Sequence, residues 1–444
     1  MKQVKFAQTA KVFLLSRSIL LVLLSVIIFQ SSQIAVFATE PLSKADKLAI
    51  FDDVWQTIRD RYYDSRLRGI DWTAQRATFR RRAGESQTSA ELYSIMRLMV
   101  SELRDSHTRI FAPDEKLDWR NPRIITIGIF VREIENELVV INVEKGSTAE
   151  KFGIQIGDTI TKIDGVPSDS AFAQKIYEQK GSSTVAAGHL KAAATLYDAK
   201  EKTFVNVTRR DEKNVERFAS LPRQYKTYPP SLRVRRENAT LIIAFDSFTN
   251  DIVREFYDAL NSNLRGVRAI VLDLRGNRGG STDAMTDLTS AFLPVGSEIG
   301  KFIDRRGKIA VDAQTRRQIF YSSKPIDVSQ LPVTILTSTA TASAAEIFTS
   351  TLKRNNRAKV IGTTTCGCVL AIRRQHSLPD GGVLEISELN YQTENGKSLE
   401  GVGVSPDEIV LPNKTDLRNR RDRTLERAFE TMKNRTSGYN KGKS

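Results

Sequence analysis

Apolar residues recur every three or four positions in two stretches near the start of the chain. These stretches cover residues 50–62 and 92–103, and Thr88 and Ser89 supply a capping signal before the second one. The spacing is typical of amphipathic helices that bury one face. We therefore predict an N-terminal helical cap over residues 41–120.

The pattern changes to short alternating apolar runs with glycine turns between residues 121 and 215. Alternation over four to eight residues is typical of half-buried strands. The runs are Ile124–Val131, Leu138–Val143 and Ile160–Ile163. They predict a compact β-rich domain.

Strands and helices alternate along residues 230–412, after a basic, proline-containing crossing. Strands are expected at 239–245, 269–274, 333–336 and 359–361, and helices at 251–264, 283–292 and 343–355. This order favours a crossover-connected sheet with helices on its faces, so we predict a multi-domain α/β protein. A basic helix and tail, frayed from residue 436, are expected over residues 413–444.

Length and composition support several folded units. The chain has 444 residues, of which 40% are hydrophobic and 27% charged. At roughly 150 residues per domain this length suggests about three domains, and the composition excludes a disordered or fibrous protein.

The N-terminus has the layout of a secretory signal. Basic residues precede an apolar run, Ile19–Phe29, and the small residues Val36 and Ala38 follow it. We predict a signal peptide over residues 1–38 that is cleaved after Ala38, with an uncleaved anchor as the alternative. The protein is therefore expected to be exported, periplasmic or otherwise extracytoplasmic.

The formal net charge of +15 raises the question of an anionic partner. Arginine clusters at 80–82 and 418–423 could contact an anionic membrane surface, which suits an exported protein better than nucleic acid does. A solvated basic face without a specific partner is the favoured interpretation. No nucleic-acid partner is predicted.

Cys366 and Cys368 are the only cysteines, so a disulfide framework is excluded. The pair could close a small disulfide or bind a metal, but fortuitous small residues beside a glycine turn are favoured. No cluster of ligand-type residues surrounds the pair in sequence, and no histidine pair has ligand spacing. Neither a metal nor another cofactor is predicted.

Glycine turns on either side of a short strand characterise the β-rich domain. Gly157 and Gly165 flank Ile160 and Ile163 in the expected strand. The pattern resembles a PDZ domain, a fold that adds a peptide tail as an extra strand and holds its terminal carboxylate on backbone amides. Ile127, Gly128, Ile129 and Phe130 match the carboxylate-binding loop of that family, and a structural domain without a ligand is the alternative.

Two motifs in the α/β segment have the chemistry needed for acyl transfer. One can stabilise an oxyanion, and the other supplies a hydroxyl that can form an acyl-enzyme. The glycine-rich turn at 272–280 follows a strand and offers free amides to a developing oxyanion. Ser343, in the stretch Thr341–Glu346, stands where a strand meets a helix, so its hydroxyl is expected at the carboxyl end of the sheet. Alone, Ser343 would more often be a helix cap.

Four motifs in order resemble the tail-specific, or carboxyl-terminal processing, serine peptidases. They are D-L-R-x-N-x-G-G from Asp273, T-A-S-A-A-E from Thr341, L-P-D-G-G from Leu378 and E-G-V-G-V from Glu400. The resemblance covers about residues 41–411. It implies peptide-bond hydrolysis with Ser343 as nucleophile, and Gly279 and Ala344 as the likeliest oxyanion hole, with Gly280 as the near alternative.

The chain departs from the commonest family pattern at the general base. The turn that usually carries a lysine has Cys368 at that position. A tricorn-like branch of the family uses a Ser-His pair and a glutamate instead, and Ser106, His107 and Glu400 match those positions. A surface histidine at a helix end is the alternative for His107.

The sequence thus predicts an exported serine endopeptidase that binds protein C-terminal tails. The alternative is a catalytically inactive relative that acts as a peptide- or ligand-binding scaffold. Loss of the lysine base is the change expected in a peptidase that has lost its activity. A metal enzyme ranks third.

Overall fold

The computed structural model describes residues 42–115, 123–317 and 326–441, with side chains described as far as Lys433. The chain divides into two units, Met1–Ser43 and Lys44–Ser444, and the elements described below belong to the second. The predicted signal peptide, residues 1–38, lies outside the described residues. Within the described residues, no helix is both long enough and apolar enough to cross a membrane.

The N-terminal cap consists of helices α2 (Lys44–Arg61), α3 (Trp72–Glu85) and α4 (Ser89–Ser101). The indole nitrogen of Trp55 donates to the carbonyl of Trp72, and the indole of Trp72 donates to the carbonyl of Trp55. These two buried bonds join α2 to α3. Helix α3 lies within the predicted helical cap, but its position was not predicted, because polar and arginine side chains dilute its apolar stripe.

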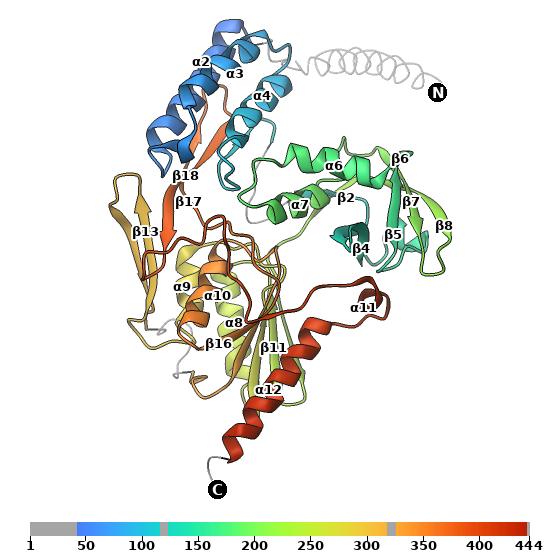
Figure 1. The fold of residues 1–444 in the computed structure, drawn as a ribbon, viewed down its shortest axis with the longest axis vertical. Coiled ribbons are helices and arrows are strands. Elements are labelled where there is room, and N and C mark those ends of the chain that lie inside the picture. The colour runs from blue at the N-terminus through green and yellow to red at the C-terminus, as the bar shows by residue number, and fades with distance from the viewer. Residues whose placement is uncertain (1–41, 116–122, 318–325, 442–444) are drawn as a thin grey trace, which may run out of the picture. The chain divides into compact units, whose positions relative to one another are not determined.

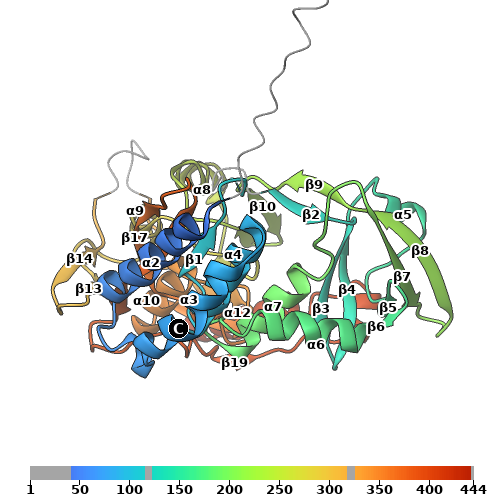
Figure 2. The same cartoon turned by 90° about the horizontal axis from the view of Figure 1, so that it is seen from above.

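The β-rich domain has the sheet order β3-β4-β5-β7-β8. Its elements are β3 (Ile129–Ile134), β4 (Glu137–Val143), β5 (Thr159–Ile163), β7 (Phe204–Arg210), β8 (Glu216–Pro222), α5 (Thr148–Lys151), α6 (Ser168–Glu178) and α7 (Val185–Ala194). Helices α6 and α7 lie beside this sheet (Figure 2). Phe172 of α6 and Ala192 of α7 pack into the same core as the sheet. Strand β8 lies beyond residue 215, so the sheet continues past the expected end of the domain.

A second sheet of six strands forms the α/β core, in the order β10-β11-β12-β15-β16-β19. The strands are β10 (Leu232–Glu237), β11 (Thr240–Phe245), β12 (Ala269–Asp273), β15 (Val333–Thr337), β16 (Ala358–Gly362) and β19 (Glu408–Ile409). All neighbours from β11 to β19 pair in parallel. The predicted multi-domain α/β fold class is confirmed.

Helices cover both faces of this sheet (Figure 1). The core on one face includes side chains of α8 (Asn250–Asn263), α9 (Thr282–Thr289) and α10 (Ala344–Arg354). The other face packs against α12 (Arg423–Lys441). Strands buried on both faces are apolar almost throughout, which explains the continuous runs in the sequence.

The C-terminal segment is more than a polar helix. A short helix, α11 (Lys414–Arg418), precedes α12, and Leu425, Ala428 and Met432 of α12 are buried against the sheet. Helix α12 also continues to Lys441, so the prediction of a frayed end from residue 436 is wrong for residues 436–441. The apolar stripe of α12 packs against the sheet and stabilises the helix there, whereas the many charged residues around it hide this stripe in the sequence.

A third sheet, which was not predicted, connects the cap to the α/β core. It contains β13 (Glu298–Asp304), β14 (Ile309–Gln314), β17 (Ala371–Ser377), β18 (Val383–Gln392) and β1 (Arg109–Phe111). Strand β1 follows the cap directly and pairs antiparallel with β18. The residues just before β1 are thereby fixed against the α/β core.

Candidate active site

Ser343 stands between the end of β15 and the start of α10. Its backbone has φ 57° and ψ −123°, a conformation that non-glycine residues rarely adopt and that is held here by its surroundings. Its amide donates to the carbonyl of Cys368 at 2.9 Å and to Glu346 Oε2 at 3.0 Å. A sharp turn of this kind presents a side chain at the carboxyl end of a parallel sheet.

The glycine turn after β12 lies directly against this serine. Gly279 has φ +94°, and a Cβ on it would lie 2.6 Å from Ser343 Cβ, so only glycine fits. However, the amide of Gly279 donates to Asn277 Oδ1 at 2.9 Å. Among the described residues, the amides of Gly280 and Ala344 have no acceptor, and Gly280 lines the same cavity as Ser343. The geometry therefore favours Gly280 over Gly279 as the partner of Ala344.

Glu346 organises the loop behind the serine, a role that the sequence did not reveal. Its fully buried carboxylate accepts hydrogen bonds from Thr365 Oγ1 and from the amides of Gly367, Cys368 and Ser343. Burial raises the pKa of Glu346, and the bonds from Thr365, Cys368 and Gly367 oppose that shift. One carboxylate thus fixes both the serine and the loop at residues 366–368.

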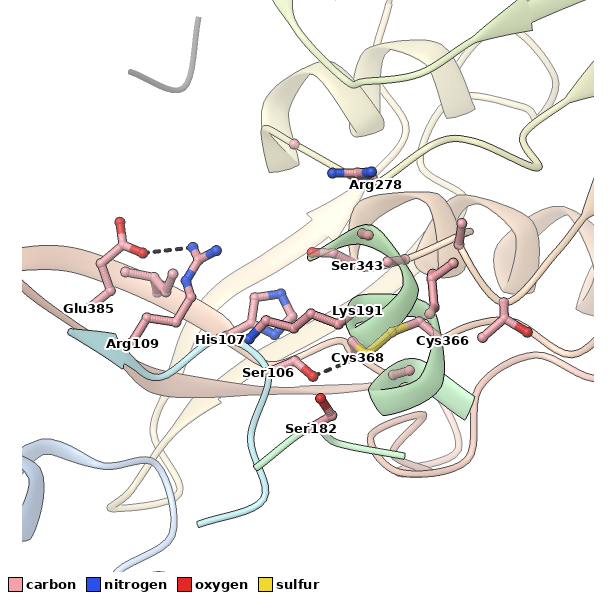
Figure 3. A pocket seen from close by; sticks show the side chains of 18 of the residues that line it. Ser106, His107, Arg109, Ser182, Lys191, Arg278, Ser343, Cys366, Cys368 and Glu385 are labelled. Carbon is pink, nitrogen blue, oxygen red and sulfur yellow. Dashed lines mark hydrogen bonds and ion pairs between the residues drawn. A yellow bond between two sulfur atoms is a disulfide. The ribbon is translucent and has the colours of Figure 1, made fainter. Parts of the chain in front are cut away.

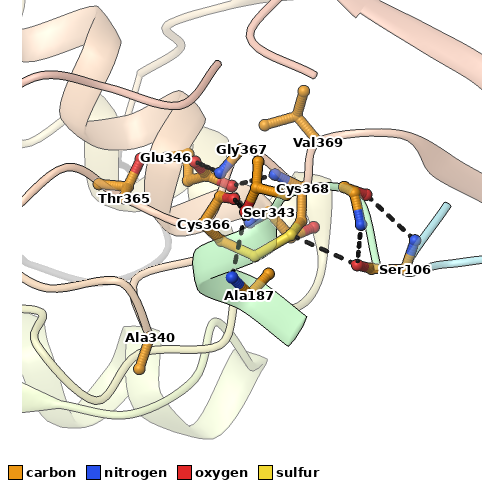
Figure 4. Close-up of a disulfide and its surroundings, with 12 residues drawn as sticks. Ser106, Ala187, Ala340, Ser343, Glu346, Thr365, Cys366, Gly367, Cys368 and Val369 are labelled. Atoms are coloured by element: carbon orange, nitrogen blue, oxygen red, sulfur yellow. Dashed lines mark hydrogen bonds between the residues drawn. A yellow bond between two sulfur atoms is a disulfide. The ribbon is translucent and has the colours of Figure 1, made fainter. Parts of the chain in front are cut away.

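Cys366 and Cys368 are joined by a disulfide (Figure 4). The interpretation of these residues as fortuitous small side chains is therefore wrong. The bond closes the turn at the place where the family usually has its lysine, and both cysteines line the cavity that contains Ser343. A sequence separation of two gave little reason to expect a disulfide, because the surrounding backbone decides whether two side chains can meet.

His107 follows the cap and precedes β1. Its backbone amide donates to Asp105 Oδ1 at 2.8 Å, while its buried ring Nδ1 has no partner among the described residues. Burial lowers the pKa of His107, the negative charge of Asp105 opposes the shift and Arg109 adds to it. A neutral imidazole is the form that can accept a proton.

Glu400 lies near the same segment without touching His107. Its side chain is 4% exposed; Oε2 accepts from the amide of Val369 at 2.9 Å, and Oε1 lies 3.7 Å from Arg68. Burial and the neighbouring Asp105 raise the pKa of Glu400 to about 7. No hydrogen bond joins Ser343, His107 and Glu400 in the described part of the chain.

Ser106 connects the cap to the β-rich domain. Its amide donates to Ser183 Oγ and its Oγ accepts from the amide of Ser183, at 3.1 and 3.0 Å. The same Oγ lies 3.6 Å from Cys368 Sγ. Ser106 therefore holds the His107 segment against both the disulfide and the residues that precede α7.

A cavity of about 600 Å³ unites most of the predicted catalytic residues (Figure 3). Ser106, His107, Gly280 and Ser343 line it. Glu400, Gly279 and Ala344 are not among its lining residues. The structure thus places the predicted nucleophile and base in the lining of one pocket.

The predicted carboxylate-binding loop is arranged differently from expectation. The side chains of Ile127 and Ile129 are buried in the core of their own domain, and Phe130 packs edge-on to Tyr228. The amide of Gly128 donates to Thr126 Oγ1. The side chains of Ile127 and Ile129 are therefore unavailable to a peptide, whereas the half-buried Phe130 and the backbone of the loop remain.

A second cavity, of about 1070 Å³, lies between the β-rich domain and the α/β core. Its lining includes Arg132 to Ile134 of β3 and Val185 and His189 of α7. It shares Leu190 and Thr339 with the first cavity, so the two adjoin. The loop 127–130 lines neither cavity.

The described residues contain no group of three or more His, Cys, Asp or Glu side chains placed to bind a metal ion. In the predicted basic clusters, Arg80 pairs with Asp52, and Arg421 and Arg423 pair with Glu426.

Comparison with known families gives matches in the same order as these domains. Residues 239–410 match the model of peptidase family S41, residues 43–101 match the tricorn protease C1 domain, and residues 126–214 match a PDZ domain.

Relatives and solved structures agree with these matches. A probable CtpA-like serine protease of Staphylococcus aureus (strain bovine RF122 / ET3-1) is 28% identical over 320 residues, or 70% of this chain and 58% of the relative. One of Staphylococcus haemolyticus (strain JCSC1435) is 25% identical over 316 residues, with the same coverage. The chain thus spans less than two thirds of the length of these relatives.

Two solved structures share the fold. The photosystem II D1 C-terminal processing protease has a TM-score of 0.54 at 22% identity, covering 82% of this chain and 93% of that one. Mature CPAF complexed with lactacystin has a TM-score of 0.64 at 14% identity, covering 88% and 98%.

The fold and these matches combine a PDZ domain with a peptidase-like α/β core that has a serine at the carboxyl edge of its sheet. Residues 239–410, less than half of the chain, are thus similar to peptidase family S41, and the N-terminal region is similar to the tricorn C1 domain.

Proposed function

We propose that the protein is an exported serine endopeptidase that forms an acyl-enzyme on Ser343 and uses His107 as general base. The observation that carries the proposal is the single cavity shared by Ser343, His107 and Gly280. Ser343 stands there in a strained turn beside two amides that have no acceptor among the described residues.

The chemical steps follow from this arrangement. Ser343 Oγ attacks the carbonyl carbon of the scissile bond while His107 takes the hydroxyl proton. The amides of Gly280 and Ala344 stabilise the oxyanion, the C–N bond breaks, and His107 returns the proton to the leaving amine. Water activated by His107 then hydrolyses the ester and frees Ser343.

In this proposal Glu400 and Ser106 assist His107. Glu400 favours the imidazolium through its negative charge, although the two side chains form no hydrogen bond in the structure. Binding of a substrate would have to bring Ser343 and His107 into hydrogen-bond contact, as often occurs when an empty site fills.

The PDZ domain supports a preference for protein C-terminal tails. A tail added along β3, with its carboxylate on the backbone at residues 127–130, would extend past Arg132–Ile134 into the second cavity. From there the adjoining cavity leads to Ser343. We expect amidation of a substrate's C-terminus to weaken binding markedly.

Export is supported by two observations. The signal-like pattern at residues 1–38 is one, and the disulfide between the only two cysteines is the other, because disulfides persist in oxidising compartments.

Labelling with a fluorophosphonate tests the proposal. We expect covalent labelling of the wild-type protein at Ser343, and neither labelling nor cleavage of an unfolded protein by Ser343→Ala. Absence of a hydrogen bond between His107 and Ser343 favours a second candidate, an inactive peptide-binding scaffold. An unlabelled wild-type protein that still binds peptide tails would support that candidate instead.

A further inference from the structure

The catalytic cavity has an unusual balance of charge. Among its lining residues are five basic side chains and one carboxylate, Glu385. The basic side chains are Arg109, Lys191, Arg278, Arg373 and Arg374. The whole chain has 67 basic and 52 acidic residues, so the basic composition of the protein does not explain a ratio of five to one.

Three of these cations have no acidic partner. Arg109 pairs with Glu385 at 2.7 Å, and Arg374 lies 3.8 Å from Glu388. Among the described residues, no carboxylate lies within ion-pair distance of Lys191, Arg278 or Arg373. Unpaired cations gathered in one pocket repel one another, and an anion that enters relieves this repulsion.

Lys191 and Arg278 line the same cavity as Ser343. Lys191 belongs to α7 of the PDZ domain and Arg278 to the glycine turn, and the two side chains lie on opposite sides of Ser343 in Figure 3. Lys191 is exposed to the cavity but surrounded by protein, and this desolvation, together with Arg109 and Arg97, lowers its pKa. A carboxylate beside Lys191 would favour its charged form.

The terminal carboxylate of a substrate is not the anion that fits here. The loop proposed to hold that group, residues 127–130, lies outside the cavity, and the tail must cross the length of β3 and the second cavity first. The anion next to Ser343 is therefore an internal side chain of the substrate.

We propose that the cavity selects peptides with aspartate or glutamate next to the scissile bond, and that Lys191 and Arg278, with Arg373, recognise those carboxylates. This inference rests on the proposed peptidase function and names its substrate class.

The test begins with β-casein as an unfolded substrate, whose cleavage sites are mapped by mass spectrometry. Matched peptides around one site then carry Asp and Glu, or Asn and Gln, within two residues of the cleaved bond, each with a free or amidated C-terminus. The quantity compared is the ratio of kcat/KM for the acidic and the neutral peptide, in the wild type and in Lys191→Gln and Arg278→Gln. Lys200→Gln, an exposed lysine of the same domain that lines neither cavity, is the control.

We expect a ratio of roughly ten in favour of the acidic peptide, since a charged hydrogen bond contributes about 1.5 kcal/mol. The ratio should fall several-fold in Lys191→Gln and in Arg278→Gln, remain in Lys200→Gln and survive amidation. Because the wild-type comparison needs no variant, poor folding of a variant, seen by circular dichroism, does not prevent the test.

A wild-type ratio near one would overturn the inference while leaving the peptidase function intact. Loss of the preference on amidation would also overturn it, because the terminal carboxylate would then be the anion bound. Absence of all cleavage, together with an unlabelled Ser343, would contradict the proposed function and this inference with it.

Discussion

Two of the predicted catalytic residues, His107 and Glu400, have pKa values displaced in opposite directions from their ordinary values. Burial lowers the pKa of His107, whereas burial and Asp105 raise the pKa of Glu400 to about 7. A histidine with a lowered pKa stays neutral at lower pH, and a glutamate with a raised pKa is ionised only near neutrality. The proposed mechanism needs both the neutral histidine and the ionised glutamate.

Activity should therefore rise with pH through two steps. The first belongs to deprotonation of His107, below its ordinary value of about 6.5, and the second to ionisation of Glu400 near pH 7. In Glu400→Gln the upper step should vanish, leaving a lower plateau. Profiles of kcat/KM from about pH 5 to about pH 9 measure this.

His107→Gln serves as the companion variant and should lose all turnover while binding peptides as before. If His107→Gln retained full activity, another group would be the base. If the step near pH 7 persisted in Glu400→Gln, that step would not report Glu400.

Part of the candidate site could be predicted from residue identity alone. Ser343 and His107 are recognisable from their motifs, and the structure places both in one cavity. The choice between Gly279 and Gly280 could not be made from sequence, because it depends on Asn277 turning its side chain to take one amide. Glu346 is visible in its motif, but its four hydrogen bonds come from residues up to 22 positions away.

At the scale of elements, the loop after β16 (Ala358–Gly362) is held from two sides. The Cys366–Cys368 disulfide closes it, and Glu346 of α10 binds its amides. Its carbonyl at Cys368 in turn holds the amide of Ser343. Because the carboxylate contacts remain without the disulfide, the loop should loosen rather than unfold.

Reduction of the disulfide should lower stability modestly and activity partially. Closing so short a loop contributes about 1–2 kcal/mol to the free energy of unfolding, and we expect dithiothreitol or the double variant Cys366→Ala/Cys368→Ala to remove this amount. Thermal denaturation and kcat/KM, with and without dithiothreitol, measure the two effects. The chain has no other cysteine, so the double variant must be insensitive to the reductant; an equal response in both proteins would show that the disulfide is not its cause.

Elements with strong local patterns were predictable, and those made by distant pairing were not. Strands 269–274 and 333–336 are apolar because both faces of their sheet are covered, and both agree closely with β12 and β15. Strands β13 and β17 carry mixed side chains, and β18 is recognisable only through its partners. The sheet that anchors His107 was therefore invisible in the sequence.

At the scale of the whole Lys44–Ser444 unit, three regions meet at the N-terminus of α7. Thr184 Oγ1 accepts from the amide of Ala187, capping the helix, and donates to the carbonyl of Cys366 at 2.8 Å. Ser183 exchanges hydrogen bonds with Ser106 of the cap. The PDZ domain, the disulfide loop and the His107 segment therefore share one junction, through which the position of α7 affects the catalytic residues.

Thr184→Val tests whether this junction matters for catalysis. Valine keeps the shape of threonine but removes both hydrogen bonds, so we expect the free energy of unfolding to fall by about 1–2 kcal/mol. We also expect kcat/KM to fall several-fold, because the disulfide loop loses its contact with α7. The matched control is Thr195→Val at the other end of the helix, where Oγ1 donates only to the carbonyl of Lys191. Denaturant unfolding and peptide cleavage, measured on both variants, separate stability from function: if Thr184→Val lost stability but cleaved peptides as fast as Thr195→Val, the junction would only hold the domains together.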